Sequence, residues 1–221
     1  MSSTTQQSES RLRITEIFFS LQGESSYVGL PTVFVRLTGC PLRCGYCDTA
    51  YAFTGGEWMG VDEIIRQVNQ YNAEYVCVTG GEPLAQRGCG ELLTQLCDDG
   101  HLVSIETSGA MDISQVDSRV SRIMDIKTPG SGEESKNRYE NIDLLTHRDE
   151  VKFVLCDRAD YDWARQVIDK YQLTSICQVL LSPVHGELKP SELADWIIAD
   201  RLNVRFQLQL HKYLWDNEPG R

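Results

Sequence analysis

The chain has 221 residues, 41% of them hydrophobic, which is enough apolar surface to bury the core of one sizeable domain. Its formal net charge of −11 repels phosphate backbones, and no basic patch offsets that charge, so the composition argues against nucleic-acid binding. No apolar run approaches the roughly 20 residues that span a bilayer, and the polar N-terminus lacks the apolar core of a secretory signal. We therefore expect a cytoplasmic protein without a membrane partner.

A single domain is predicted over residues 1–221, with the polar residues 1–11 as a disordered tail. Short apolar runs then alternate with segments whose apolar residues recur three and four positions apart. Such alternation is typical of a parallel sheet with crossover helices, and it predicts an open or closed α/β barrel. Strands are expected at 13–19, 32–39, 75–81, 102–109, 121–127, 150–155, 176–183 and 204–212, and helices at 61–71, 89–100, 161–172 and 189–201.

Polar and glycine-rich residues follow the carboxyl ends of most of these apolar runs. The carboxyl ends of parallel strands meet at one edge of a sheet, so these residues are expected to form a single rim that carries the working groups. The segment 128–143 is long, polar and glycine-bearing, which predicts a mobile loop over that rim.

Three of the eight cysteines lie on the loop after the run 32–39, with the spacing C-x3-C-x2-C. In a chain without a secretory signal, Cys40, Cys44 and Cys47 are better explained by metal binding than by disulfides. A structural zinc site needs four ligands, and no second pair of Cys or His follows. A redox pair of Cys44 and Cys47 leaves Cys40 without a role. An iron-sulfur cube held by three cysteines keeps one iron open to an exogenous ligand.

The segment CPLRCGYC at 40–47 resembles the cysteine motif of the radical S-adenosylmethionine (SAM) enzymes, with Tyr46 at their aromatic position. TGGEP at 79–83 resembles their glycine-rich strand end, while ETSG at 106–109 and DIKTPG at 125–130 lie where that family contacts SAM. The resemblance implies a partial, open parallel β/α barrel of about six strands, with a 4Fe-4S cluster on the three cysteines and SAM on its open iron. It implies SAM contacts at Tyr46, Cys47, Asp48, Gly81, Ser108, Lys127, Thr128 and Pro129.

A closer resemblance is to the 7-carboxy-7-deazaguanine synthase family of radical SAM enzymes. It is almost continuous over residues 18–49 and extends from about residue 14 to the LHK at 210–212. It implies a lyase of the 7-deazapurine (queuosine) pathway that contracts the ring of 6-carboxy-5,6,7,8-tetrahydropterin and releases ammonia to give 7-carboxy-7-deazaguanine. The cofactors that it implies are the 4Fe-4S cluster, SAM and Mg²⁺, and no further catalytic side chain is predicted.

The same resemblance assigns residues to the substrate and to magnesium. Arg36 is expected to clamp the substrate carboxylate, since an apolar strand has little reason to carry a guanidinium unless it borders a polar cavity; a salt bridge on the strand face is the alternative. Thr49 is assigned to Mg²⁺, with turn capping by Asp48 and Thr49 as the alternative. Glu82 is either a partner of the cofactor's amino group or a structural residue. The substrate contacts are Leu21, Gln22, Gly23, Arg36 and Thr79.

The family resemblance also implies a flavodoxin- or ferredoxin-type reductant and a homodimer. Two other functions are open: an activase of glycyl-radical enzymes, which shares the cysteine motif but acts on a protein, and a non-enzymatic zinc-binding module. LQGE at 21–24 and CDT at 47–49 favour the small-molecule enzyme over the activase. The lack of an evident fourth ligand disfavours the zinc-binding module.

Overall fold

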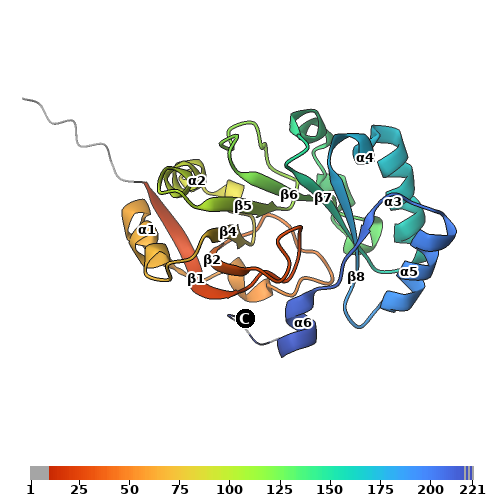
Figure 1. The fold of residues 1–221 in the computed structure, drawn as a ribbon, viewed down its shortest axis with the longest axis horizontal. Coiled ribbons are helices and arrows are strands. Elements are labelled where there is room, and N and C mark those ends of the chain that lie inside the picture. The colour runs from red at the N-terminus through yellow and green to blue at the C-terminus, as the bar shows by residue number, and fades with distance from the viewer. Residues whose placement is uncertain (1–9, 217, 219, 221) are drawn as a thin grey trace, which may run out of the picture.

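A curved mixed sheet forms the centre of the computed structural model, which describes residues 10–216, 218 and 220 (Figure 1). Within that part of the chain, nine strands lie in the order β3-β1-β2-β4-β5-β6-β7-β8-β9. The two end strands, β3 and β9, do not pair with each other, so the sheet stays open. The strands are β1 (Arg11–Leu21), β2 (Pro31–Leu37), β3 (Glu57–Gly60), β4 (Tyr75–Gly80), β5 (Leu102–Thr107), β6 (Ser121–Asp125), β7 (Glu150–Leu155), β8 (Gln178–Pro183) and β9 (Arg205–Phe206).

The strands from β4 to β9 all run parallel to one another and to β2. Six of these parallel strands have at least five residues, whereas β9 has two. The structure thus confirms the predicted α/β fold with an open parallel barrel of about six strands.

β1 and β3 are the antiparallel part of the sheet, and the alternation of strands and helices does not predict their direction. β1 pairs with β2 from Ile14 opposite Leu37 to Leu21 opposite Pro31. The connection over residues 22–30 is too short for a crossover helix, so the chain turns back. Loop 22–30 therefore lies at the amino end of β2, and the cysteine loop over residues 38–49 follows its carboxyl end.

Helices α1 to α5 cover the outer face of the sheet, and their apolar faces pack on it (Figure 1). In the first turn of α1, the positive end of the helix dipole stabilises the carboxylates of Asp62 and Glu63. Val61, Ile64 and Val68 form the buried apolar face of this helix. The four predicted helices are confirmed with shifted ends, and α4 and α6 are additional. The helices are α1 (Val61–Asn69), α2 (Cys89–Asp98), α3 (Arg158–Tyr171), α4 (Leu173–Ile176), α5 (Pro190–Ala199) and α6 (Leu210–Trp215).

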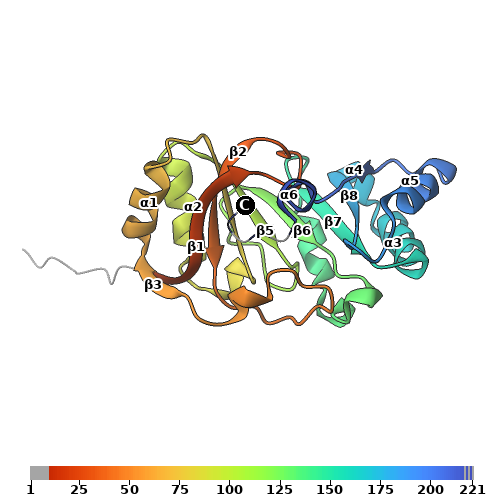
Figure 2. The ribbon, with the colours of Figure 1, turned by 90° about the horizontal axis from the view of Figure 1, so that it is seen from below.

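The strand predicted at 204–212 is wrong beyond its first residues. Only Arg205–Phe206 pairs with β8, and the chain then forms α6. The backbone N–H of Leu210 donates to the carbonyl of Gly23 at 2.9 Å, which takes the chain away from the sheet. Figures 1 and 2 show α6 on the open side of the sheet, between β2 and β8.

Two other expectations concern segments outside the regular elements. The segment predicted as a mobile loop at 128–143 contains three 3-10 turns, and Asn141 and Ile142 within it are buried. The tail predicted at 1–11 is too long, because β1 begins at Arg11; residues 1–9 lie outside the described residues. Within the described residues, no helix has the length and apolar character needed to cross a bilayer.

Candidate active site

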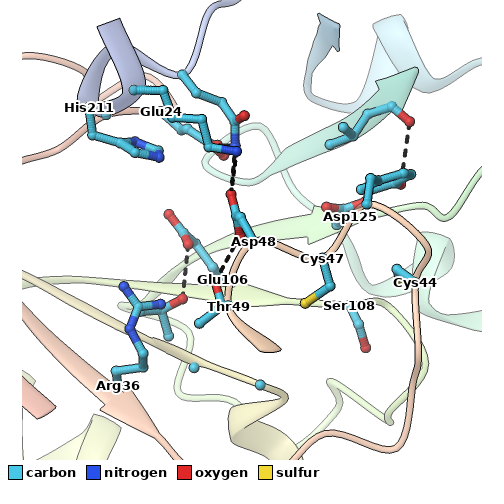
Figure 3. A pocket seen from close by; sticks show the side chains of 18 of the residues that line it. Glu24, Arg36, Cys44, Cys47, Asp48, Thr49, Glu106, Ser108, Asp125 and His211 are labelled. Carbon is cyan, nitrogen blue, oxygen red and sulfur yellow. Dashed lines mark hydrogen bonds and ion pairs between the residues drawn. The ribbon is translucent and has the colours of Figure 1, made fainter. Parts of the chain in front are cut away.

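The carboxyl ends of the parallel strands border one cavity of about 350 Å³, as the predicted rim requires. Loop 22–30 and α6 also contribute to its wall. Figure 3 shows Cys44 and Cys47 on one side of this cavity, and Glu24 and His211 on the other. We call these two sides the cysteine end and the loop end.

Most residues predicted for the site line this cavity, whereas Thr128 and Pro129 do not. Thr128 is fully buried, and its hydroxyl donates to Asp160 Oδ2 at 2.9 Å. The predicted residues in the lining are Leu21, Gln22, Gly23, Arg36, Cys40, Cys44, Tyr46, Cys47, Asp48, Thr49, Thr79, Gly81, Ser108 and Lys127.

The three clustered cysteines are free thiols that face the cavity, and they fit an iron-sulfur cluster. The N–H of Leu42 donates to Cys40 Sγ at 3.4 Å, the kind of bond that stabilises cluster sulfurs. Burial raises the pKa of Cys40 and of Cys44, so ligation must replace their protons with iron. Among the described residues, no three Cys, His, Asp or Glu side chains converge on a single ion; a cube holds its ligands further apart.

The glycine turn after β4 packs directly on the cysteine loop. A Cβ added at Gly81 would collide with the carbonyl of Gly39 and lie 2.8 Å from Cys40 Cβ. The N–H of Gly81 donates to Leu37 O at 3.1 Å, and the N–H of Glu82 donates to Gly39 O at 2.8 Å. Only glycine allows this approach, which fixes the backbone beside the first cysteine.

Glu82 is a structural residue in this arrangement, since it is fully buried and does not line the cavity. Its carboxylate accepts hydrogen bonds from the N–H of Leu84 at 3.0 Å and the N–H of Ser108 at 2.7 Å. It also accepts from the hydroxyls of Thr107 and Ser108. Glu82 therefore ties the end of β4 to the end of β5 and orients Ser108.

An unpaired carboxylate oxygen lies at the cysteine end of the cavity. Asp125 Oδ2 pairs with Lys127 Nζ at 3.0 Å, but Asp125 Oδ1 is buried without a hydrogen-bond partner among the described residues. A buried acceptor of this kind is costly unless a bound molecule supplies a donor. The position fits a polar cofactor beside the cysteines.

Arg36 lies in the cavity wall with part of its guanidinium already paired. Its Nε donates to Glu16 Oε1 at 2.6 Å, and its guanidinium lies over the rings of Phe18 and Tyr51 at 5.7 and 5.9 Å. The salt bridge considered as the alternative is therefore present. The side chain still borders the cavity, so an anion there can meet its remaining N–H groups.

Glu106 belongs to the ETSG motif, but the sequence reasoning gave it no role of its own, although it lines the polar wall of the cavity. It accepts from Thr79 Oγ1 at 3.0 Å and from Gln22 Nε2 at 3.3 Å. A carboxylate in the apolar run LVSIET was the available signal. Through these two bonds Glu106 joins the predicted Gln22 and Thr79 in one hydrogen-bonded surface of the cavity wall.

Asp48 and Thr49 form an oxygen-rich corner between the two ends of the cavity. Thr49 Oγ1 donates to Asp48 Oδ1 at 2.8 Å, and Lys212 Nζ from α6 lies 2.7 Å from Asp48 Oδ2. Burial alone would raise the pKa of Asp48, but the Lys212 ammonium outweighs it and holds that pKa far below its usual value. The corner offers the oxygen ligands that Mg²⁺ prefers.

The loop end contains further residues that sequence reasoning did not assign. Lys152 Nζ donates to Glu24 Oε2, and Gln209 Nε2 donates to Glu24 Oε1 at 2.8 Å. Burial alone would lower the pKa of Lys152, but the carboxylates of Glu24 and Asp125 raise it well above its usual value. Burial lowers the pKa of His211. A lysine inside the fully buried strand β7 was the signal for this group.

Comparison with known proteins agrees with this architecture. The model of the Radical SAM superfamily matches residues 34–187. A 7-carboxy-7-deazaguanine synthase of Chlorobaculum tepidum is 47% identical over 211 residues, covering 94% of this chain and 96% of that protein. Another, of Koribacter versatilis, is 44% identical over 222 residues, covering 94% and 98%. The crystal structure of QueE from Escherichia coli has a TM-score of 0.75 at 22% identity, covers 91% of this chain and 95% of that one, and supports the fold alone.

These matches confirm the family resemblance read from the motif CPLRCGYC. They favour neither the glycyl-radical activase nor the zinc-binding module. Superfamily membership brings a 4Fe-4S cluster and SAM as cofactors, with Mg²⁺ as the metal of the synthases. The chain belongs to the Radical SAM superfamily and, within it, to the family of the 7-carboxy-7-deazaguanine synthases.

Proposed function

We propose that this chain is a 7-carboxy-7-deazaguanine synthase, a lyase that converts 6-carboxy-5,6,7,8-tetrahydropterin to 7-carboxy-7-deazaguanine with loss of ammonia. The observation that carries the proposal is one cavity that joins three cysteine thiols to polar groups suited to a carboxylated pterin. The relatives at 47% and 44% identity carry the name of this activity.

At the cysteine end, Cys40, Cys44 and Cys47 would hold the cluster, and neighbouring residues would hold SAM. When bound, these groups supply the radical chemistry that removes hydrogen from the substrate. Gly81 lines the cavity beside Cys40 and would meet the cofactor through its backbone. Further SAM contacts are proposed at Tyr46, Cys47, Asp48, Ser108 and Lys127, with Asp125 as an added acceptor.

At the loop end, side chains match the groups of a pterin. Its lactam and exocyclic amine need both donors and acceptors, which the Gln22 amide and the Glu106 carboxylate provide from one surface. Leu21, Gly23 and Thr79 complete that surface. Arg36 would take the substrate carboxylate through the guanidinium nitrogens that Glu16 does not use.

Between the two ends, Thr49 is the proposed protein ligand of Mg²⁺. A magnesium ion keeps several waters and needs only one or two protein oxygens when the substrate supplies others. Asp48, hydrogen-bonded to Thr49, would orient the hydroxyl and balance the charge of the ion. The ion would then bridge protein and substrate beside the cysteine loop.

Aromatic and aliphatic side chains would limit the access of water to this site. Phe18, Phe34, Leu42 and Phe53 line the cavity together with the polar groups. A carbon radical reacts with whatever lies nearest, so an apolar lining protects the reaction.

A flavodoxin- or ferredoxin-type protein is the proposed electron donor, and the chain is proposed to work in the cytoplasm as a homodimer. Pro41, Arg43 and Gly45 alternate with buried or half-buried neighbours and are exposed on the outer side of the cysteine loop. This short exposed stretch gives a protein donor access close to the cluster.

The test is anaerobic turnover by reconstituted protein with SAM, Mg²⁺, a chemical reductant and 6-carboxy-5,6,7,8-tetrahydropterin. Mass spectrometry should detect 7-carboxy-7-deazaguanine, and one ammonia should form for each product molecule. A C44A variant is the control, since it should lose both cluster and product. Cleavage of SAM by the native protein without any deazapurine product would refute the proposed activity.

A further inference from the structure

We propose that Asp160, a residue outside the cavity, is a positioning residue for the cysteine loop and acts through the segment 128–133. The inference rests on the assignment, proposed above, of Cys40, Cys44 and Cys47 as cluster ligands. It also gives Thr128, which does not line the cavity, a role different from cofactor contact.

Asp160 occupies a fixed position at the start of α3. The side chain of the N-cap residue Asp157 accepts a hydrogen bond from the N–H of Asp160 at 3.0 Å, and Asp160 is only 2% exposed. A carboxylate in the first turn of a helix is favoured by the positive end of the helix dipole. Asp160 is thus held in place as part of the 14-residue helix α3.

The Asp160 carboxylate holds the first part of the segment 128–133 directly. Its Oδ1 accepts from the N–H of Gly130 at 2.8 Å, and its Oδ2 accepts from the Thr128 hydroxyl at 2.9 Å and from the N–H of Cys156 at 3.0 Å. A Cβ added at Gly130 would collide with Asp160 Oδ2. Three donors therefore converge on one carboxylate, and one of them requires glycine.

The far part of the same segment holds the cysteine loop on both sides of Cys44. The N–H of Gly45 donates to Ser131 O at 3.0 Å, and the N–H of Arg43 donates to Glu133 Oε1 at 2.6 Å. Figure 2 shows the orange loop after β2 reaching the green segment after β6, in agreement with these bonds.

Internal hydrogen bonds make the segment a rigid connection. Ser131 Oγ donates to Thr128 O at 2.6 Å and accepts from the N–H of Glu133 at 3.1 Å. Thr128 and Ser131 are 0% and 2% exposed. A displacement of Thr128 or Gly130 must therefore move Ser131 and the backbone that flanks Cys44.

The cysteine loop depends on such outside contacts because the part that carries the ligands has no helix or strand of its own. Gly81 and Glu82 fix it near Cys40, and the segment 128–133 fixes it near Cys44. Asp160 is the buried end of the second attachment. Substitution of Asp160 should therefore loosen the relative positions of the three cysteine ligands, although no ligand itself is changed.

The test compares three variants as reconstituted, cluster-loaded proteins. Asp160→Asn keeps the size of the side chain but replaces one acceptor oxygen with an NH₂ group. That group would face the N–H and O–H donors that now bond to the carboxylate, so at least one of these hydrogen bonds is lost. Thr128→Val removes one donor and keeps the shape. Tyr161→Phe removes a hydrogen bond of 2.8 Å from the same helix to Asp200 but no bond to Asp160 or to the segment, and it is the matched control.

Two readouts that do not need the pterin are measured: the rate of iron release to a chelator in the absence of SAM, and the EPR spectrum of the reduced cluster before and after SAM. D160N should release iron at least about tenfold faster than the native protein, as expected for the loss of one charge-assisted hydrogen bond. T128V should show a smaller increase, and both variants should alter the EPR spectrum. Y161F should lower the melting temperature but leave both readouts native.

Several results would overturn the inference. Iron release by D160N within about twofold of the native rate would do so, as would an equal acceleration in Y161F. A T128V protein that binds SAM weakly but releases iron at the native rate would make Thr128 a cofactor contact instead. If D160N does not fold, T128V decides alone. Failure of pterin turnover leaves these readouts intact, whereas a C44A protein that keeps its full iron content would refute the proposed ligands.

Discussion

Replacing Gln207 with Leu should weaken pterin binding although Gln207 does not line the cavity. Its Oε1 accepts from the N–H of Ser25 at 2.8 Å, and its Nε2 donates to Ser25 O at 2.8 Å. Ser25 is fully buried and has a left-handed φ of 64°, which costs a non-glycine residue about 1 kcal/mol. Gln207 therefore holds a strained residue directly beside Gln22 and Glu24.

The size of the effect follows from those two bonds. Leucine leaves the N–H and C=O of Ser25 unpaired, at roughly 1–3 kcal/mol each if the loop stays in place. The loop can instead relax toward water and relieve its strain, so we expect a loss of unfolding free energy near the lower limit, about 2 kcal/mol. If the cavity-forming loop conformation becomes tenfold rarer, the apparent pterin Kd rises by about tenfold.

Anaerobic calorimetric titration of the pterin into protein loaded with cluster and SAM measures this change. SAM affinity should stay native, because the Gln207 side chain makes its two hydrogen bonds to Ser25 at the loop end. Gln207→Glu, which keeps the acceptor for Ser25, should give an intermediate Kd. A Q207L protein that is destabilised but binds the pterin within about twofold of the native affinity would refute the reasoning.

Three further variants test other contacts. Arg36→Ala should weaken pterin binding by about tenfold to a hundredfold, because a charge-assisted pair is lost, while SAM affinity stays native. Equal pterin affinity of native protein and variant in a titration would remove Arg36 from the site. Glu82→Gln should lower SAM affinity by about tenfold, because the carboxylate orients Ser108; native SAM binding would contradict this. Burial alone would raise the pKa of Asp149, but hydrogen bonds from Arg122 and Thr146 outweigh it and lower that pKa. The stability that this provides is present above the pKa of Asp149 in the unfolded chain and is lost as pH falls through its pKa in the folded chain. The urea concentration at the unfolding midpoint of the apoprotein should therefore decrease once the pH is below about 4, and it should decrease less steeply in D149N.

The parallel part of the fold was predictable because each buried strand is a continuous apolar run between helical patterns. The antiparallel direction of β1 was missed, although the short connection over residues 22–30 was the available signal. The strand predicted at 204–212 is cut short by contacts with the same loop. The N–H of Gln207 still donates to Leu181 O of β8 at 2.9 Å, but the Gln207 side chain and the N–H of Leu210 bond to loop 22–30.

The cysteine end of the site was predictable because the carboxyl ends of neighbouring parallel strands must converge. Cys40, Gly81, Ser108 and Lys127 follow successive strands and all line one cavity. Thr128 continues the same motif but turns to Asp160, since one residue further along the chain the backbone has left the cavity. Strand ends predict where a site lies, but not which of two adjacent side chains enters it.

The loop end was harder to predict because its partners are far apart in the sequence. Glu24 and Lys152 are separated by 128 positions, and no local pattern joins them. Yet all six residues of β7 are buried, and a lysine in such a strand is unfavourable unless carboxylates meet it. Glu24 does so at the loop end, and Asp125 Oδ2 lies 3.7 Å from the same ammonium toward the cysteine end. A buried charge in a parallel strand thus predicts partners on both sides of it, and here those partners connect the proposed substrate and cofactor sites.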